Sequence, residues 1–404
     1  MALELKKYRN STELANLNGF PIYMSDMMDA ALRGRLNTLL LGDTGSGKSQ
    51  LAKDLMDYFP EKSLFILGRN DMDTRELFQR VNPEFLRALK EGNLNSNTKL
   101  KELTDKINYN LIVNDELPNC VPSVRAQLFN LFDGFIEIDG KLYSIGDGYS
   151  IGVATGNMGQ QFTESSNDLG RALKDRMHLI LDTDHFRPQP IDTFDILNND
   201  RNPRVNFTES LEDRSLDIIQ KHNELKEREV PFDKHIIAAY LVHALDYVEG
   251  FGSKIGMKSS WPNQLDGHAS GSDEALILPV SLRAAKSIIT LSQALDQITE
   301  EEGAKDLDYF NSMMTAFKFV SAYSGILNEA LVRSVHSGNH YRAMDAVIET
   351  ARREFDSKNE AIAAGYEMVN EGKMSEKVMN KFSGRWGYMQ NLLENFNKRN
   401  ETSK

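Results

Sequence analysis

The segment that most constrains this chain is Gly42-Asp43-Thr44-Gly45-Ser46-Gly47-Lys48-Ser49. It fits the phosphate-loop pattern G-x-x-x-x-G-K-[ST], and it has the flanks that this pattern requires. The apolar run at 36–41 predicts a buried strand before the loop, and residues 49–56 predict a helix after it. Strand, glycine-rich loop and helix together predict that a nucleoside triphosphate binds here.

The residue types of this loop suit a polyphosphate. Glycines let the backbone N–H groups of the loop turn toward the phosphates, and the following helix adds the positive end of its dipole. Lys48 is expected to reach the β and γ phosphates, and the hydroxyl of Ser49 is expected to hold Mg²⁺. The expected ligands are therefore ATP and Mg²⁺.

A second segment, Leu111-Ile112-Val113-Asn114-Asp115-Glu116, is an apolar run that ends in two adjacent carboxylates. Such a run predicts a buried parallel strand that delivers both acids at its carboxyl end, where ligands bind in open α/β sheets. Asp115 is expected to bind Mg²⁺ through water, and Glu116 is expected to polarise the attacking water. The pair therefore indicates hydrolysis rather than binding alone.

The next residues predict a helix, a hairpin and a further strand. Apolar residues recur at helical spacing within 118–134, and Asp139-Gly140 predicts a tight turn between strands at 135–138 and 141–145. The run at 150–155 predicts a strand that leads to Asn157, which is expected to orient the lytic water.

The order and spacing of these elements resemble those of the MoxR-like AAA+ ATPases, a group of the helix-2-insert clade that includes the CbbQ, NorQ and GvpN types. The resemblance spans about residues 30–300. It departs from the family pattern at Asn114, at Leu117-Pro118-Asn119 and in residues 86–106. The elements it assigns are Walker A at 42–49, Walker B at 111–116, sensor 1 at Asn157, an arginine-finger segment at 170–177 and a sensor 2 helix start at 279–285.

This resemblance implies a ring, usually a hexamer, with nucleotide between subunits. An arginine of one subunit then completes the site of its neighbour, and Arg176 and Arg171 are the candidates in that order. A guanidinium suits the role because it is planar and permanently charged. Arg283 is the candidate sensor 2 arginine. The resemblance also implies a protein client and a partner with a von Willebrand factor A domain.

Composition sets further limits. The net charge of −12 argues against general affinity for nucleic acid. The single cysteine, Cys120, excludes an internal disulfide framework and favours a reducing compartment. The first ten residues lack the apolar core of a signal peptide, and no run approaches about 18 apolar residues. We therefore expect a cytoplasmic protein without a membrane span.

The predicted fold is a P-loop AAA+ parallel sheet flanked by helices, followed by a helical lid and a helical C-terminal extension. We expect an α/β domain at 1–190, a lid at 191–335 and the extension at 336–404, with a surface loop at 250–274. The predicted function is an ATPase that remodels or activates a protein client. The alternative is a nucleotide-gated binding module or a DNA-associated AAA+ motor.

Overall fold

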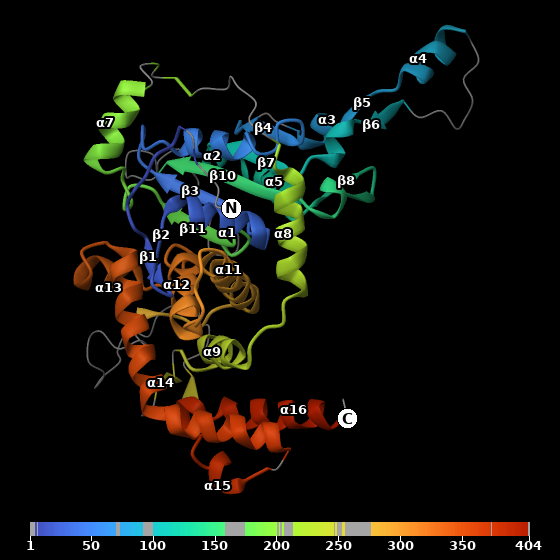
Figure 1. Cartoon of the computed structure of the whole chain (residues 1–404). Helices are drawn as coiled ribbons and strands as arrows, with labels where there is room; N and C mark the ends of the chain where they lie inside the picture. Colours follow the sequence, from blue (N-terminus) through green and yellow to red (C-terminus); the bar gives the residue numbers. More distant parts are fainter. Residues whose placement is uncertain are drawn as a thin grey trace. The chain divides into compact units, whose positions relative to one another are not determined.

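The computed structural model divides the chain into two compact units, of which the first carries the sheet and the second is helical (Figure 1). The first comprises Met1–Leu169, Arg176–Arg228 and Gln297–Gly303, and the second comprises Gly170–Asp175, Glu229–Asp296 and Ala304–Lys404. The division into three domains that the sequence predicts, with boundaries after residues 190 and 335, remains a prediction. The residues that the structure describes are 5, 7–69, 73–91, 100–157, 174–199, 202, 204–205, 213–245, 247–248, 253–254, 276–372 and 374–402.

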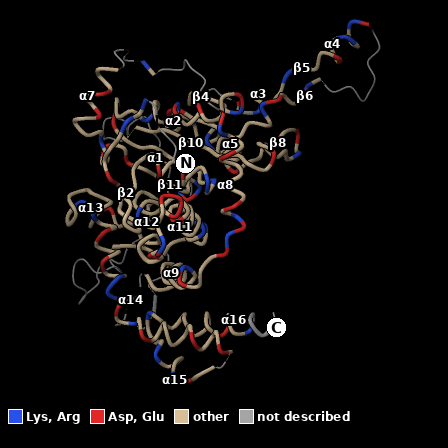
Figure 2. The backbone as a smooth tube through the Cα atoms, in the orientation of Figure 1, with Lys and Arg blue, Asp and Glu red and all other residues tan. Residues whose placement is uncertain are grey.

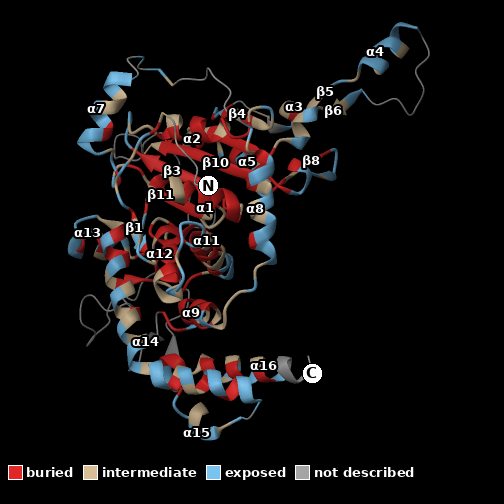
Figure 3. Cartoon of the chain, in the orientation of Figure 1, coloured by how far each residue is buried: buried red, intermediate tan, exposed pale blue. Residues whose placement is uncertain are grey.

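The first unit is built on a five-stranded parallel sheet with the strand order β11-β3-β10-β7-β4. Its central strands β3, β10 and β7 are buried (Figure 3), as expected for a parallel sheet covered on both faces. The sheet and its helices confirm the predicted α/β fold class. The strand bounds are β3 at Thr38–Gly42, β4 at Ser63–Leu67, β7 at Leu111–Asp115, β10 at Ile151–Asn157 and β11 at Leu179–Asp182.

Helices pack against this sheet through apolar and small side chains. Helix α2 contacts β3, β7 and β10, and α5 contacts β10. Gly152 of β10 permits this approach of α5, because a Cβ there would lie 2.3 Å from Phe132 Cγ. The helices of the first unit are α1 at Met24–Gly34, α2 at Lys48–Met56, α3 at Thr74–Phe78, α4 at Pro83–Lys90, α5 at Pro122–Phe132, α7 at Pro190–Asn199 and α8 at Ser215–Glu227.

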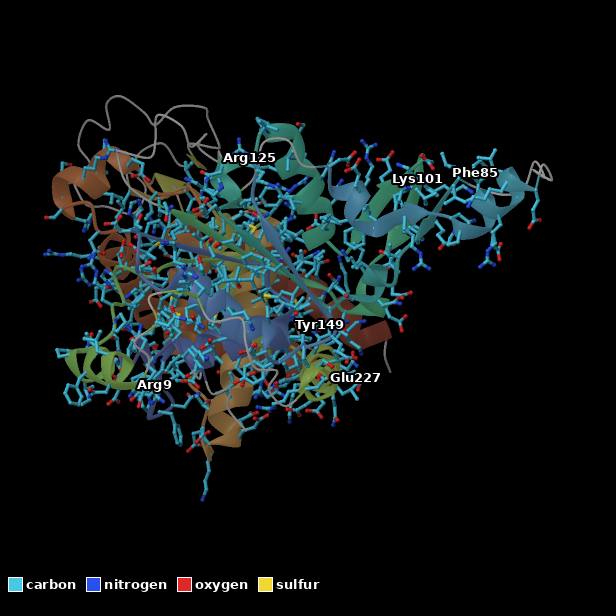
Figure 4. All side chains as sticks on the ribbon, turned by 90° about the horizontal axis from the view of Figure 1, so that it is seen from above. Arg9, Phe85, Lys101, Arg125, Tyr149 and Glu227 are labelled. Carbon is cyan, nitrogen blue, oxygen red and sulfur yellow. The ribbon has the colours of Figure 1, made fainter. Side chains whose placement is uncertain are left out.

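The described residues of this unit also form three separate two-stranded antiparallel sheets. They are β1 (Ala15–Leu17) with β2 (Phe20–Ile22), β5 (Gln79–Val81) with β6 (Lys101–Leu103), and β8 (Phe135–Ile138) with β9 (Lys141–Ser144). The β8–β9 turn confirms the Asp-Gly prediction, since Asp139 and Gly140 have φ values of 51° and 73°. The β5–β6 pair carries α4 on an exposed arm, where Figure 4 labels Phe85 and Lys101.

A partly buried ion network joins α1 to the last turn of α11 (Leu282–Glu301). Arg33 forms ion pairs with Asp29 at 2.9 Å and with Glu301 at 2.8 Å, and Lys221 of α8 lies 3.1 Å from Glu301. Arg33 is 2% exposed. A guanidinium at such a depth needs paired carboxylates, because an uncompensated buried charge is strongly destabilising.

The second unit is helical where the structure describes it, apart from the short pair β12 (Tyr247–Val248) and β13 (Ser253–Lys254). Within its core, Lys234 Nζ lies 2.5 Å from Asp296 Oδ2 and both side chains are almost fully buried. Tyr341 and Trp386 are also buried in this unit. The helices are α9 at Phe232–His243, α11, α12 at Tyr309–Ser321, α13 at Glu329–Val335, α14 at His340–Glu371, α15 at Glu376–Met379 and α16 at Tyr388–Thr402.

A break at residues 322–328 separates α12 from α13 in this unit. The break includes Gly325 at φ 84° and a β-bridge between Leu327 and Ile277. A left-handed glycine and a bridge cannot be accommodated within an α-helix. The loop predicted at 250–274 lies almost entirely outside the described residues.

Candidate nucleotide-binding site

The phosphate loop lies where the sequence predicts it, between the end of β3 at Gly42 and the start of α2 at Lys48. Gly45 and Gly47 have φ values of 82° and 84°, in the left-handed region that favours glycine. Ser46 Oγ lies 3.0 Å from Thr183 Oγ1, which fixes the loop against the residue that follows β11. The loop is therefore held in place by its own glycines and by a neighbouring strand.

Lys48 is a buried lysine at the first position of α2. Its Nζ donates to Gly42 O at 3.1 Å, to Asp43 O at 2.7 Å and to Ser46 Oγ at 3.1 Å. Burial lowers the pKa of Lys48, and the charges of Asp184 and Asp115 oppose that shift. The ammonium group is thus kept inside the loop at the place where a phosphate chain would lie.

Ser49 and Asp115 meet at the junction of α2 and β7. Ser49 Oγ donates to Asp115 Oδ1 at 2.8 Å, and Thr155 Oγ1 of β10 donates to the same oxygen at 2.5 Å. A hydroxyl and a carboxylate beside a phosphate site are the oxygen ligands that Mg²⁺ prefers. These two residues therefore fit the predicted metal role, and Thr155 is a third polar group that sequence reasoning missed.

Glu116 follows β7 and has a left-handed backbone, with φ 62° and ψ 45°. Its N–H donates to Thr155 Oγ1 at 3.0 Å, and Asn119 Nδ2 donates to its Oε2 at 2.7 Å. Gly68 lies against its carbonyl, since a Cβ at Gly68 would be 2.5 Å from Glu116 O. Backbone and carboxylate are therefore both fixed, by residues from three neighbouring segments.

Asn157 ends β10 in register with Gly42 of β3, so the predicted sensor 1 residue and the phosphate loop meet at one edge of the sheet. Both lie at the carboxyl ends of parallel strands, the usual ligand position in such folds. A cavity of about 770 Å³ opens at this edge. The residues that line it include Thr44, Gly45, Gly47, Lys48, Ser49, Asp115, Glu116, Asn157, Lys7, Arg9, Leu197 and Arg204.

Of the three candidate arginines, Arg171 lies outside the described residues. Arg176 is half-buried, and the described lining of the cavity does not include it. Arg283 lies in the first turn of α11 in the second unit, where its Nη1 lies 3.5 Å from Asp175 Oδ2. Ser281 Oγ donates to the other oxygen of Asp175 at 2.6 Å.

The parallel sheet, the loop between β3 and α2, and the two acids at the carboxyl end of β7 define a P-loop nucleotide-binding protein. Residues 37–177 match the family model of the AAA domain, dynein-related subfamily. The chain therefore carries an AAA domain, which confirms the AAA+ part of the resemblance. An AAA domain implies nucleotide binding.

A solved structure supports the same fold. The crystal structure of a candidate ATPase from Cytophaga hutchinsonii is 15% identical, with a TM-score of 0.56. The match covers 80% of this chain and 88% of that chain. None of the curated proteins compared with this chain matches it. Among the described residues, no helix has the length and apolar character needed to cross a membrane.

Proposed function

We propose that this chain is an ATPase of the MoxR-like AAA+ type that remodels or activates a protein client. The observation that carries the proposal is the hydrogen-bonded group of Ser49, Asp115, Thr155 and Glu116 beside the phosphate loop. These residues bring two hydroxyls and two carboxylates to one wall of a cavity whose volume suits a nucleotide.

In this proposal each residue of the cavity has a separate task. The N–H groups of residues 42–47 and the ammonium of Lys48 bind the phosphates. Ser49 and Asp115 hold Mg²⁺, which when bound neutralises charge on the β and γ phosphates. Glu116 polarises the attacking water, and Asn157 orients it.

The remaining site residues have roles in a ring of subunits or in the helical lid. A homo-oligomeric ring, usually a hexamer in this group, brings Arg176 or Arg171 to the neighbour's nucleotide. Arg283 reports the nucleotide state to the helical lid. The β8–β9 hairpin, whose Leu142 side chain is 70% exposed, transmits that state to the client. A partner with a von Willebrand factor A domain and a cytoplasmic location complete the proposal.

Glu116→Gln tests the catalytic assignment. Hydrolysis is expected to fall about 10²- to 10⁴-fold because the amide cannot polarise water as the carboxylate does. Binding of a fluorescent ATP analogue should persist, and light scattering should show assembly at least equal to that of the wild type. Glu227→Gln, at an exposed acid on α8 labelled in Figure 4, is the matched control. Hydrolysis by Glu116→Gln at the wild-type rate would refute the assignment.

The client assignment is tested by capture with the same variant from the native host. A copurifying protein that stimulates the wild-type ATPase supports the proposal. Stimulation by DNA, with binding that weakens as salt rises, favours the DNA-associated motor instead. Nucleotide binding by the wild type without any turnover favours the nucleotide-gated binding module.

A further inference from the structure

The segment Lys7–Thr12, here called the strap, is fastened to the helix that follows the phosphate loop. Asp54 Oδ2 of α2 accepts hydrogen bonds from the backbone N–H groups of Lys7 and Tyr8, both at 2.8 Å. Gln50 Nε2 donates to the other oxygen of Asp54 at 2.8 Å. Asp54 is 2% exposed, so its carboxylate is bound by these protein groups instead of by solvent. It therefore fixes the position of the strap.

The other end of the strap is fastened to α7. Asp192 Oδ2 accepts from both the N–H and the hydroxyl of Ser11 at 2.9 Å, and Thr12 Oγ1 donates to Arg187 O at 2.8 Å. Asp192 is 7% exposed. The strap therefore spans from α2 to α7, and residues of both helices line the nucleotide cavity.

Between these anchors the strap packs directly on the phosphate loop. Tyr8 is 4% exposed, and a Cβ at Gly47 would lie 2.9 Å from its ring atom Cε2. Position 47 thus requires glycine for two reasons. Its backbone is left-handed, and the Tyr8 ring leaves no room for a Cβ. Any displacement of the strap would remove a side chain that supports the loop.

The strap also places two cations at the cavity. Lys7 and Arg9 line it, together with Lys48 and Arg204, against the carboxylates of Asp115 and Glu116. In Figure 4 the labelled Arg9 lies beside α7. The chain as a whole has a net charge of −12, and Asp and Glu positions are spread along the backbone of both units (Figure 2). A cavity with an excess of cations in such a chain is suited to a polyanion.

We propose that the strap is a wall of the nucleotide site and that Lys7 and Arg9 bind the polyphosphate of a nucleotide held by the same subunit. This inference rests on the proposed function and extends it, because it adds two phosphate-binding cations outside the phosphate loop. Asp54 and Asp192 are positioning residues, which fix the strap without contacting the nucleotide.

The test measures binding of fluorescent ADP and ATP analogues to Lys7→Gln, Arg9→Gln and the double variant of the full chain. Each single change should weaken binding about 3- to 10-fold, with a larger loss for ATP than for ADP because ATP carries more charge. Inorganic tripolyphosphate should lose potency as a competitor to a similar degree. Arg9→Lys should restore most of the affinity, and Lys226→Gln on the exposed face of α8 is the control.

Wild-type affinity in the double variant, with an unchanged melting temperature, would refute the strap assignment while leaving the proposed ATPase intact. Failure of the wild-type chain to bind either nucleotide would refute the proposed function itself. An equal loss of affinity for adenosine and for ATP would also refute the inference, because phosphate-binding cations do not act on the uncharged nucleoside.

Discussion

Ser49 Oγ donates a hydrogen bond to Asp115 Oδ1 across 2.8 Å and so joins the first turn of α2 to the end of β7. The two residues come from the phosphate loop and from the acidic strand, which are far apart in sequence. Their contact brings the phosphate-binding and metal-binding parts of the proposed site together.

The first prediction concerns this contact. Ser49→Ala should reduce the gain in ATP affinity that Mg²⁺ provides, by about tenfold, because one oxygen ligand and one charge-assisted hydrogen bond are lost. Titrations of a fluorescent ATP analogue with and without Mg²⁺ measure that gain. Ser357→Ala, at an exposed serine of α14, should leave it unchanged. An undiminished Mg²⁺ effect in Ser49→Ala would contradict the metal assignment.

The second prediction concerns Asn119, whose Nδ2 lies 2.7 Å from Glu116 Oε2. Asn119→Ala should lower kcat about tenfold while the Kd for ATP stays unchanged, because the amide orients the carboxylate and does not line the described cavity. Steady-state hydrolysis and equilibrium binding separate the two quantities. Faster hydrolysis by Asn119→Ala would mean that the amide restrains Glu116 instead of orienting it.

The third prediction concerns Asn114, the residue before Asp115 in β7. This side chain is fully buried, and neither its Oδ1 nor its Nδ2 has a hydrogen-bond partner among the described residues. Asn114→Val should raise the free energy of unfolding by about 1 to 2 kcal/mol, because an unsatisfied buried amide is replaced by a β-branched apolar residue. Urea denaturation of the two proteins measures the difference. Lower stability of the valine variant would show that the amide is satisfied in solution.

The fourth prediction concerns Glu301 at the end of α11. Burial raises the pKa of Glu301, but hydrogen bonds and charge from Arg33 and Lys221 outweigh it and lower the pKa from 4.5 to about 2. The stability that this group contributes is therefore present above pH 4.5 and is lost as pH falls toward 2.

Glu301→Gln should consequently cost about 1 to 2 kcal/mol at pH 7, an amount reduced by partial solvent exposure. The difference from the wild type should shrink as pH falls from 4.5 to 2. Denaturation curves at several pH values test this, with Glu227→Gln as the control. A difference that is independent of pH would assign the effect to packing and not to the charge.

Much of the first unit could be predicted from the sequence because its signals are local. The loop between β3 and α2 follows from its glycines and the flanking apolar runs, and the Asp139-Gly140 turn follows from its need for positive φ. The acids at the end of β7 were predicted to lie at the ligand edge of the sheet, which is where the structure places them.

The rest depends on residues that meet only after folding. Residues 86–106 differ in composition from the family pattern, but composition alone did not reveal the arm formed by β5, α4 and β6. Asn119 was noted only as a departure from that pattern, and its hydrogen bond to Glu116 needs the turn η2 (Leu117–Asn119) to bring the amide back.

The sequence by itself determined the phosphate loop, the acidic strand and the α/β class, because backbone sterics and hydrophobic periodicity act over a few neighbouring residues. Only the tertiary structure decided what surrounds them. The strap reaches Asp54 and Asp192 across separations of 47 and 181 residues. No local pattern encodes such contacts, since they arise when packing of the whole unit brings distant segments together.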